Sequence, residues 1–138
     1  ILFLASLSYS ANLDALQYLV DGILPHCRRT DARLDIVGSN PPRALPRISR
    51  RSPIRADPIG QVADVRPYVD RNRLLVVPLL YGGGTRLKIL EGLAQGIPMI
   101  STSVGCTGLG LSHLDEIIVA DRARPGIAAS DGPERLAF

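Results

Sequence analysis

A continuous apolar run that leads directly into a row of glycines constrains this chain more than any other feature. Leu74 to Leu80 contains no polar side chain, and Tyr81-Gly82-Gly83-Gly84-Thr85 follows at once. An uninterrupted apolar stretch of this length is typical of a strand covered on both faces, which occurs in parallel sheets flanked by helices. The glycines then form a turn without side chains ahead of a helix. The combination predicts an α/β domain.

Strand and helix signals alternate along the rest of the chain. The expected strands cover residues 1–5, 34–37, 74–80, 99–102 and 116–120, with a short extended piece that ends near residues 60–62. The expected helices cover residues 13–24 behind an Asn12 N-cap, about 64–69 behind an Asp64 cap, and 86–95 behind a Thr85 cap. This order predicts a Rossmann-like parallel sheet with helices on both faces.

Three segments give weaker signals. We expect residues 43–55 to be a surface segment, because Pro46 and Pro53 limit any helix there, and residues 105–110 to be a second glycine-rich loop. Residues 122–138 show no period and form an atypical tail. With 138 residues, 46% of them hydrophobic and 21% charged, the chain should fold as a single domain.

Composition excludes several classes of function. The aromatic fraction is 4% and tryptophan is absent, so the net charge of +3 does not indicate a nucleic-acid platform. The Ile1–Ala5 run is too short to span a bilayer, so we expect a cytoplasmic protein, and the mild positive charge permits association with the inner face of a membrane. Cys27 and Cys106 are expected to be free thiols. No metal-ligand motif is present, and no metal is expected.

The turn from Gly82 to Thr85 has the features of an anion site. Without side chains, its backbone N–H groups can approach an oxyanion closely, and the following helix start adds further donors. Arg86 and Lys88, the chain's only lysine, lie where the helix dipole disfavours cations, which is explained if a phosphate binds between them. The alternative is a tight turn with solvated basic side chains. A Walker loop and a dinucleotide fingerprint are disfavoured by the spacing.

Glu91 is the second informative residue. Helical periodicity places it between Leu87, Leu90 and Ala94, on the face that we expect to pack inward. A carboxylate there needs a partner. It could pair with Lys88 one turn earlier, or it could accept hydrogen bonds from both hydroxyls of a ribose.

These residues carry a resemblance to a known family. Residues 78–105, PLLYGGGTRLKILEGLAQGIPMISTSVG, strongly resemble the signature of group 1 (family 4-like) glycosyltransferases, in the donor-binding C-terminal half of their GT-B fold. The resemblance covers roughly residues 1–121. It implies a transferase, hexosyltransferase-like, that binds a nucleoside-diphosphate sugar and passes the glycosyl group to a glycan or lipid-linked acceptor, as in polysaccharide biosynthesis. It implies no cofactor.

The resemblance also assigns roles to residues. Glu91 matches the family's ribose-binding glutamate, and the loop of Gly82, Gly83, Gly84 and Thr85 matches the region that faces the diphosphate and sugar. Arg86 and Lys88 would be the catalytic cations, since they would stabilise charge on the departing diphosphate. Val62 is a candidate for main-chain contact with the base, and Asn12 for shaping the phosphate end of the cleft.

The chain also departs from the family pattern. Gly83 stands where many members have a first glutamate, and the basic residues that many members carry after their first strand are absent from residues 6–12. The acceptor-binding N-terminal domain is not in these residues, so we expect residues 1–138 to be one donor-binding domain that is inactive in isolation. Two alternatives stay open: a degenerate, non-catalytic fragment, or an unrelated α/β phosphate-binding module.

Overall fold

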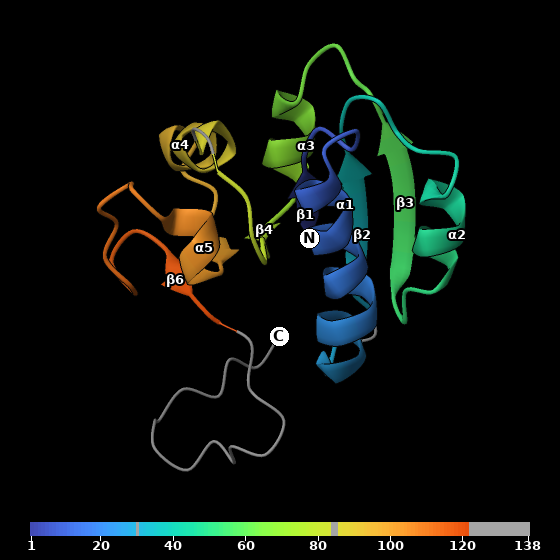
Figure 1. The fold of residues 1–138 in the computed structure, drawn as a ribbon, viewed down its shortest axis with the longest axis horizontal. Helices are drawn as coiled ribbons and strands as arrows, with labels where there is room; N and C mark the ends of the chain where they lie inside the picture. Colours follow the sequence, from blue (N-terminus) through green and yellow to red (C-terminus); the bar gives the residue numbers. More distant parts are fainter. Residues whose placement is uncertain (30, 84–85, 122–138) are drawn as a thin grey trace.

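The computed structural model describes residues 1–29, 31–83 and 86–121, and its centre is one parallel sheet of six strands (Figure 1). The strand order is β3-β2-β1-β4-β5-β6. The strands are β1 (Leu2–Leu4), β2 (Arg33–Val37), β3 (Arg55–Gly60), β4 (Leu75–Val77), β5 (Met99–Ser101) and β6 (Ile118–Val119). Every pairing is parallel. This order confirms the expected α/β, Rossmann-like fold.

The helices connect successive strands. They are α1 (Ser10–Tyr18), which continues through the π-helical turn η1 (Leu19–Ile23) and the 3-10 turn η2 (Leu24–His26), then α2 (Leu45–Arg50), α3 (Arg66–Arg71), α4 (Leu87–Ala94) and α5 (Ser103–Cys106). In Figure 1, α1 lies beside β1 and β2, α2 lies beyond β3 at one edge, and α5 accompanies β6 at the other. Cys27 and Cys106 are free thiols, as expected.

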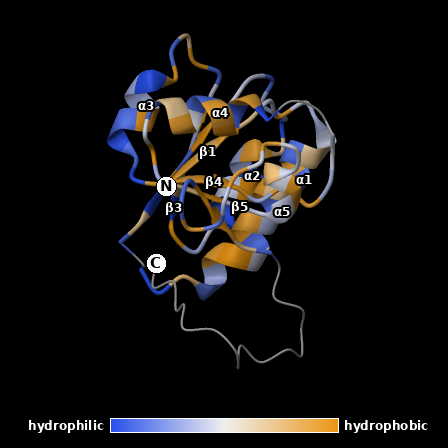
Figure 2. Ribbon diagram, turned by 90° about the vertical axis from the view of Figure 1, so that its left-hand side faces the viewer, coloured by the Kyte–Doolittle hydropathy of each residue, from blue (hydrophilic) through white to orange (hydrophobic). Residues whose placement is uncertain are grey.

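Alternate residues of β4 and β5 face opposite sides of the sheet, and the strands at its centre are largely apolar (Figure 2). Leu75 pairs with Met99, and both lie under α4, where a Cβ on Gly92 would come within 2.9 Å of Leu75 and 2.7 Å of the Met99 sulfur. The absence of a side chain at Gly92 therefore lets α4 lie close to the sheet.

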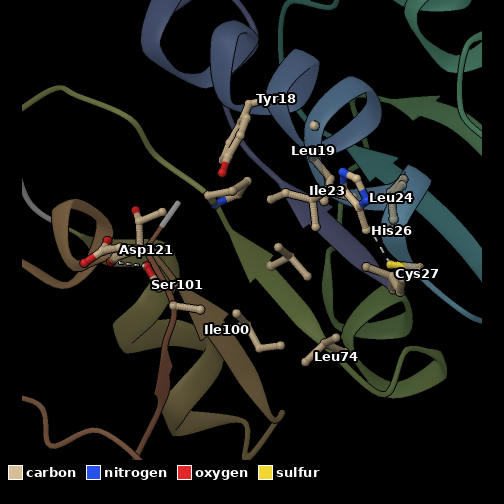
Figure 3. Close-up of a pocket in the computed structure, with 16 residues that line it drawn as sticks. Tyr18, Leu19, Ile23, Leu24, His26, Cys27, Leu74, Ile100, Ser101 and Asp121 are labelled. Carbon is tan, nitrogen blue, oxygen red and sulfur yellow. Dashed lines mark hydrogen bonds between the residues drawn. The ribbon is translucent and has the colours of Figure 1, made fainter. Parts of the chain in front are cut away.

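The described residues leave a groove on the opposite face of the same two strands. An apolar groove of about 350 Å³ lies between β4–β5 and the α1–η1 segment. Figure 3 shows Tyr18 and Ile23 on one side of the groove and Ile100 on the other. The pocket is lined by Ile1, Tyr18, Leu19, Gly22, Ile23, Leu24, His26, Cys27, Leu74, Val76, Pro78, Ile100, Ser101, Thr102, Ala120 and Asp121.

A partly buried ion pair connects α3 to the sheet at the end remote from the carboxyl ends of β1 and β2. The Asp35 carboxylate in β2 accepts hydrogen bonds from Arg71 Nε at 2.8 Å and Asn72 Nδ2 at 2.7 Å. Burial alone would raise the pKa of Asp35, but these two donors bring it below its ordinary value. Asn72 also donates to the Tyr68 carbonyl oxygen, so it closes the end of α3.

Several local expectations need correction. Asn12 is not an N-cap, because α1 begins at Ser10 and Asn12 lies buried in its first turn. α3 begins at Arg66, whose N–H donates to Asp64 Oδ1. The expected strand over residues 74–80 is shorter, and residues 103–106 form a helix capped by the Thr102 hydroxyl, so the first two residues of the glycine-rich loop expected over 105–110 are helical. The N-cap of α4 is Arg86; Thr85 lies outside the described residues.

Candidate functional site

A cleft of about 330 Å³ lies at the carboxyl ends of β1 and β2, between them and α4. In open parallel sheets this edge is where ligands bind, because the loops that follow the strands converge there. The cleft is lined by Leu4, Ala5, Ser6, Val37, Gly38, Ser39, Gln61, Val62, Val65, Lys88 and Glu91. Three residues singled out from the sequence, Val62, Lys88 and Glu91, therefore share one cavity.

Glu91 lines the cleft but is exposed, which corrects the expectation that it packs inward. The buried stripe of α4 consists of Ile89 and Gly92, whereas Leu87 is 57% and Leu90 43% exposed. The buried face of α4 differs from the expected one because the helix lies closest to the sheet at Gly92. Glu91 therefore lies on the side of the helix that borders the cleft. The carboxylate is thus accessible to a ligand rather than buried under the helix.

Lys88 lies one turn earlier on the same flank of α4 and is mostly buried. Its Nζ donates to Asn12 Oδ1 at 3.0 Å, and Asn12 Nδ2 donates to the Ser6 carbonyl oxygen at 2.8 Å. Burial lowers the pKa of Lys88 to about 8, with a smaller contribution from the positive charge of Arg86. The cation is therefore held against the loop that follows β1, at the wall of the cleft.

Arg86 takes a different position from the one expected of a side chain that reaches a phosphate. It is 8% exposed, and its guanidinium donates to the carbonyl oxygens of Gly82 at 2.9 Å, Gly83 at 3.3 Å and Val104 at 3.0 Å. Its Nε is buried and has no hydrogen-bond partner among the described residues. Arg86 therefore fastens the glycine loop to α5, and a direct contact with a donor stays a prediction.

Two glycines at the carboxyl edge of the sheet are needed for their backbone geometry. Gly82 has φ +115°, a conformation that side chains rarely adopt. At Gly38, which lines the cleft, an added Cβ would lie 1.8 Å from the Ala5 carbonyl oxygen. The chain after β2 can therefore approach the chain after β1 only because residue 38 has no side chain. Gly84 and Thr85, also predicted site residues, lie outside the described residues.

The sequence-predicted residues thus fall into two groups. Val62, Lys88 and Glu91 line the cleft, and Asn12 reaches it through its hydrogen bond to Lys88. Gly82 and Gly83 instead contact the Arg86 guanidinium. Ser39 and Gln61 also line the cleft but were not singled out from the sequence, because a polar residue after a strand is too common to identify a site.

The apolar groove of Figure 3 is slightly larger than the cleft but differs in chemistry. Lys88 and Glu91 belong to the cleft, whereas the described residues that line the groove include no lysine or arginine. Within residues 1–29, 31–83 and 86–121, three or more His, Cys, Asp or Glu side chains nowhere gather as metal ligands would. Over the same ranges, every helix falls short of the length and apolarity needed to cross a bilayer.

Comparison with known proteins gives the family. The family model for glycosyl transferases group 1 matches residues 1–130. A protein of Klebsiella pneumoniae, described as an uncharacterized 44.6 kDa protein in the cps region, is 29% identical over 58 residues, which cover 42% of this chain and 15% of that protein. The match thus spans a small part of the relative's length. Because the family model covers nearly the whole chain, the protein belongs to the group 1 glycosyltransferase family.

Proposed function

We propose that the cleft between β1, β2 and α4 binds a nucleoside-diphosphate sugar, the glycosyl donor of a transferase. The observation that carries this proposal is the shared cavity of Val62, Lys88 and Glu91, which come from two segments of the chain and were each singled out for a donor contact. A cation and a carboxylate one helical turn apart give the cleft the two kinds of partner that a nucleotide needs.

The roles follow from the chemistry of the side chains. The two oxygens of the Glu91 carboxyl group can accept hydrogen bonds from both ribose hydroxyls, since Glu91 lines the cleft. The Lys88 ammonium and the main-chain amides at the start of α4 supply positive potential for the diphosphate. The main chain at Val62, which lines the same cleft, is left for the base.

In the transferase reaction, the bond between the sugar and the diphosphate breaks and negative charge grows on the departing diphosphate. A fixed ammonium and oriented amides stabilise that charge more than they stabilise the intact donor. We assign this role to Lys88, with Arg86 acting through its charge and through the loop that it holds. An acceptor site must face the donor, and we propose that the family's other domain supplies it, so that this chain alone binds the donor without transferring the sugar.

Calorimetry tests the donor proposal on the 138-residue chain. We expect UDP, GDP, ADP or dTDP to bind weakly, and Glu91→Ala and Lys88→Met each to reduce the affinity about tenfold, because each removes a charge-assisted hydrogen bond of about 1.5–3 kcal/mol. Asp70→Ala and Arg50→Met are matched controls, because both residues are exposed and neither lines the cleft. Absence of heat with all four nucleotides at millimolar concentration would reject the proposal.

A further inference from the structure

The Lys88 side chain is held by a hydrogen bond to a residue of a different helix. It comes from α4, yet its hydrogen bond goes to Asn12 on α1, 76 residues away in the sequence. Asn12 is itself 8% exposed, and its amide nitrogen donates to the Ser6 carbonyl oxygen in the loop that follows β1. The three residues form a chain of two hydrogen bonds from the edge of the sheet to the ammonium, and Ser6 and Lys88 both line the cleft.

We infer that Asn12 is a positioning residue that fixes the Lys88 ammonium at the phosphate end of the cleft and leaves it available to an anionic ligand. This inference rests on the proposed function for the identity of the ligand, a nucleoside diphosphate. Asn12 does not itself contact the donor; its effect on affinity passes through Lys88.

The choice of an amide rather than a carboxylate supports this role. The Asn12 amide oxygen accepts a hydrogen bond from one of the three ammonium N–H groups and carries no formal charge. The cation therefore keeps its attraction for a phosphate. A carboxylate at the same place would form a buried ion pair and compete with the ligand. The opposite side of the Asn12 amide is already occupied by Ser6, so its orientation is set before any ligand binds.

The charges around Lys88 favour ligand-linked protonation. The positively charged Arg86 lies two residues before it, and Glu91 lines the same cleft. With a pKa of about 8, the free amine is a sizeable fraction near that pH, and a bound diphosphate favours the charged form. Binding of a nucleoside diphosphate at pH 8 should therefore take up about half a proton, which calorimetry in buffers of different ionisation enthalpy measures.

The single lysine gives the experiment a direct signal. Labelling with [13C]lysine yields one side-chain Cε resonance, whose pH titration reports Lys88 alone. We expect Asn12→Asp to raise the Lys88 pKa by more than one unit, because it adds a negative partner, and Asn12→Ala to lower it, because it removes the acceptor. Both variants should weaken binding of the tightest of UDP, GDP, ADP and dTDP about tenfold.

Asn72→Ala is the matched control, since it also removes an asparagine side chain with two hydrogen bonds, at the opposite end of the sheet. It should lower the unfolding midpoint without moving the Lys88 resonance or the affinity.

In a Lys88→Met background, Asn12→Ala should cause no further loss of affinity. Full additivity of the two losses, or a Lys88 pKa that neither Asn12 variant moves, overturns the inference. A wild-type chain that binds no nucleotide counts against the proposed function, and the Lys88 resonance then decides the Asn12–Lys88 pairing by itself.

Discussion

At the scale of single residues, we assign different roles to the two cations at the start of α4: Arg86 stabilises the fold and Lys88 binds the ligand. Among the described residues, the Arg86 guanidinium donates to three carbonyl oxygens, whereas the Lys88 ammonium donates to one neutral acceptor, Asn12 Oδ1, and lies at the cleft. The sequence places both in the first turn and gives no sign of this difference. It depends on Val104 and Asn12, which lie far along the chain from α4 or on another helix, and no local pattern reports such partners.

The burial of Lys88 predicts a pH dependence of stability. Its pKa is about 8 in the folded protein and 10.5 ordinarily, so above pH 8 the unfolded chain binds more protons and stability rises with pH until the unfolded lysine also titrates. Between pH 7 and pH 9 the wild-type chain should gain about 1 kcal/mol relative to Lys88→Met, whose side chain does not titrate. Urea denaturation of both proteins at the two pH values measures this. A gain of equal size in both proteins would contradict it.

Arg86 should behave in the opposite way to Lys88. Arg86→Met leaves three carbonyl oxygens without the guanidinium, so it should destabilise the chain by about 2 kcal/mol or more. Lys88→Met, which removes a buried charge held by the neutral Asn12 Oδ1, should not destabilise it at pH 7. Thermal unfolding followed by circular dichroism separates the two variants, and a loss of the same size for both would contradict the division of roles.

At the scale of elements, the loops that follow β1 and β2 are held together by a close backbone approach. The Leu7 N–H donates to the Ser39 carbonyl oxygen at 2.9 Å, and the Gly38 N–H donates to the Gly60 carbonyl oxygen at 2.8 Å. Residues 38–42, GSNPP, are typical of a turn, but the need for glycine at residue 38 arises from the Ala5 carbonyl oxygen in the segment that follows β1. Such a requirement is visible only after the strands pair.

Substitution at residue 38 tests this packing. Gly38→Ala should destabilise the fold by about 2–4 kcal/mol, because its Cβ would meet backbone that cannot move aside without breaking the β1–β2 pairing. Gly83→Ala is the matched control, since a Cβ there has no neighbour within 4 Å among the described residues, and it should change stability by less than about 0.5 kcal/mol. Chemical denaturation gives both values, and similar losses would show that residue 38 tolerates a side chain.

The order of elements was largely predictable from the sequence, and the orientation of α4 was not. Apolar runs and turn residues located the strands because buried parallel strands have few polar residues. For α4, the pattern of Leu87, Leu90 and Ala94 indicated one buried face, whereas the sheet buries Ile89 and Gly92. A glycine adds nothing to an apolar stripe in a sequence pattern, yet its small size decides which face of the helix lies closest to the sheet.

At the scale of the whole molecule, the described residues cover the two faces of the sheet to different extents. Leu75 faces α4 and is 1% exposed, while Ile100 on the neighbouring strand lines the open groove. Leu75→Ala should therefore cost about 2–5 kcal/mol, because it leaves a cavity, and Ile100→Ala should cost less than half as much, because it only widens an existing opening. Equilibrium unfolding of the two variants compares these costs, and equal losses would indicate that the groove is closed in solution.

The open groove also has a practical consequence for the discovery of inhibitors. Apolar, drug-sized compounds are expected to bind in this groove between α1 and the central strands, which shares no lining residue with the cleft of Lys88 and Glu91. A hit from a thermal-shift or fragment screen should therefore be counted as a ligand of the donor cleft only if it also competes with a nucleotide.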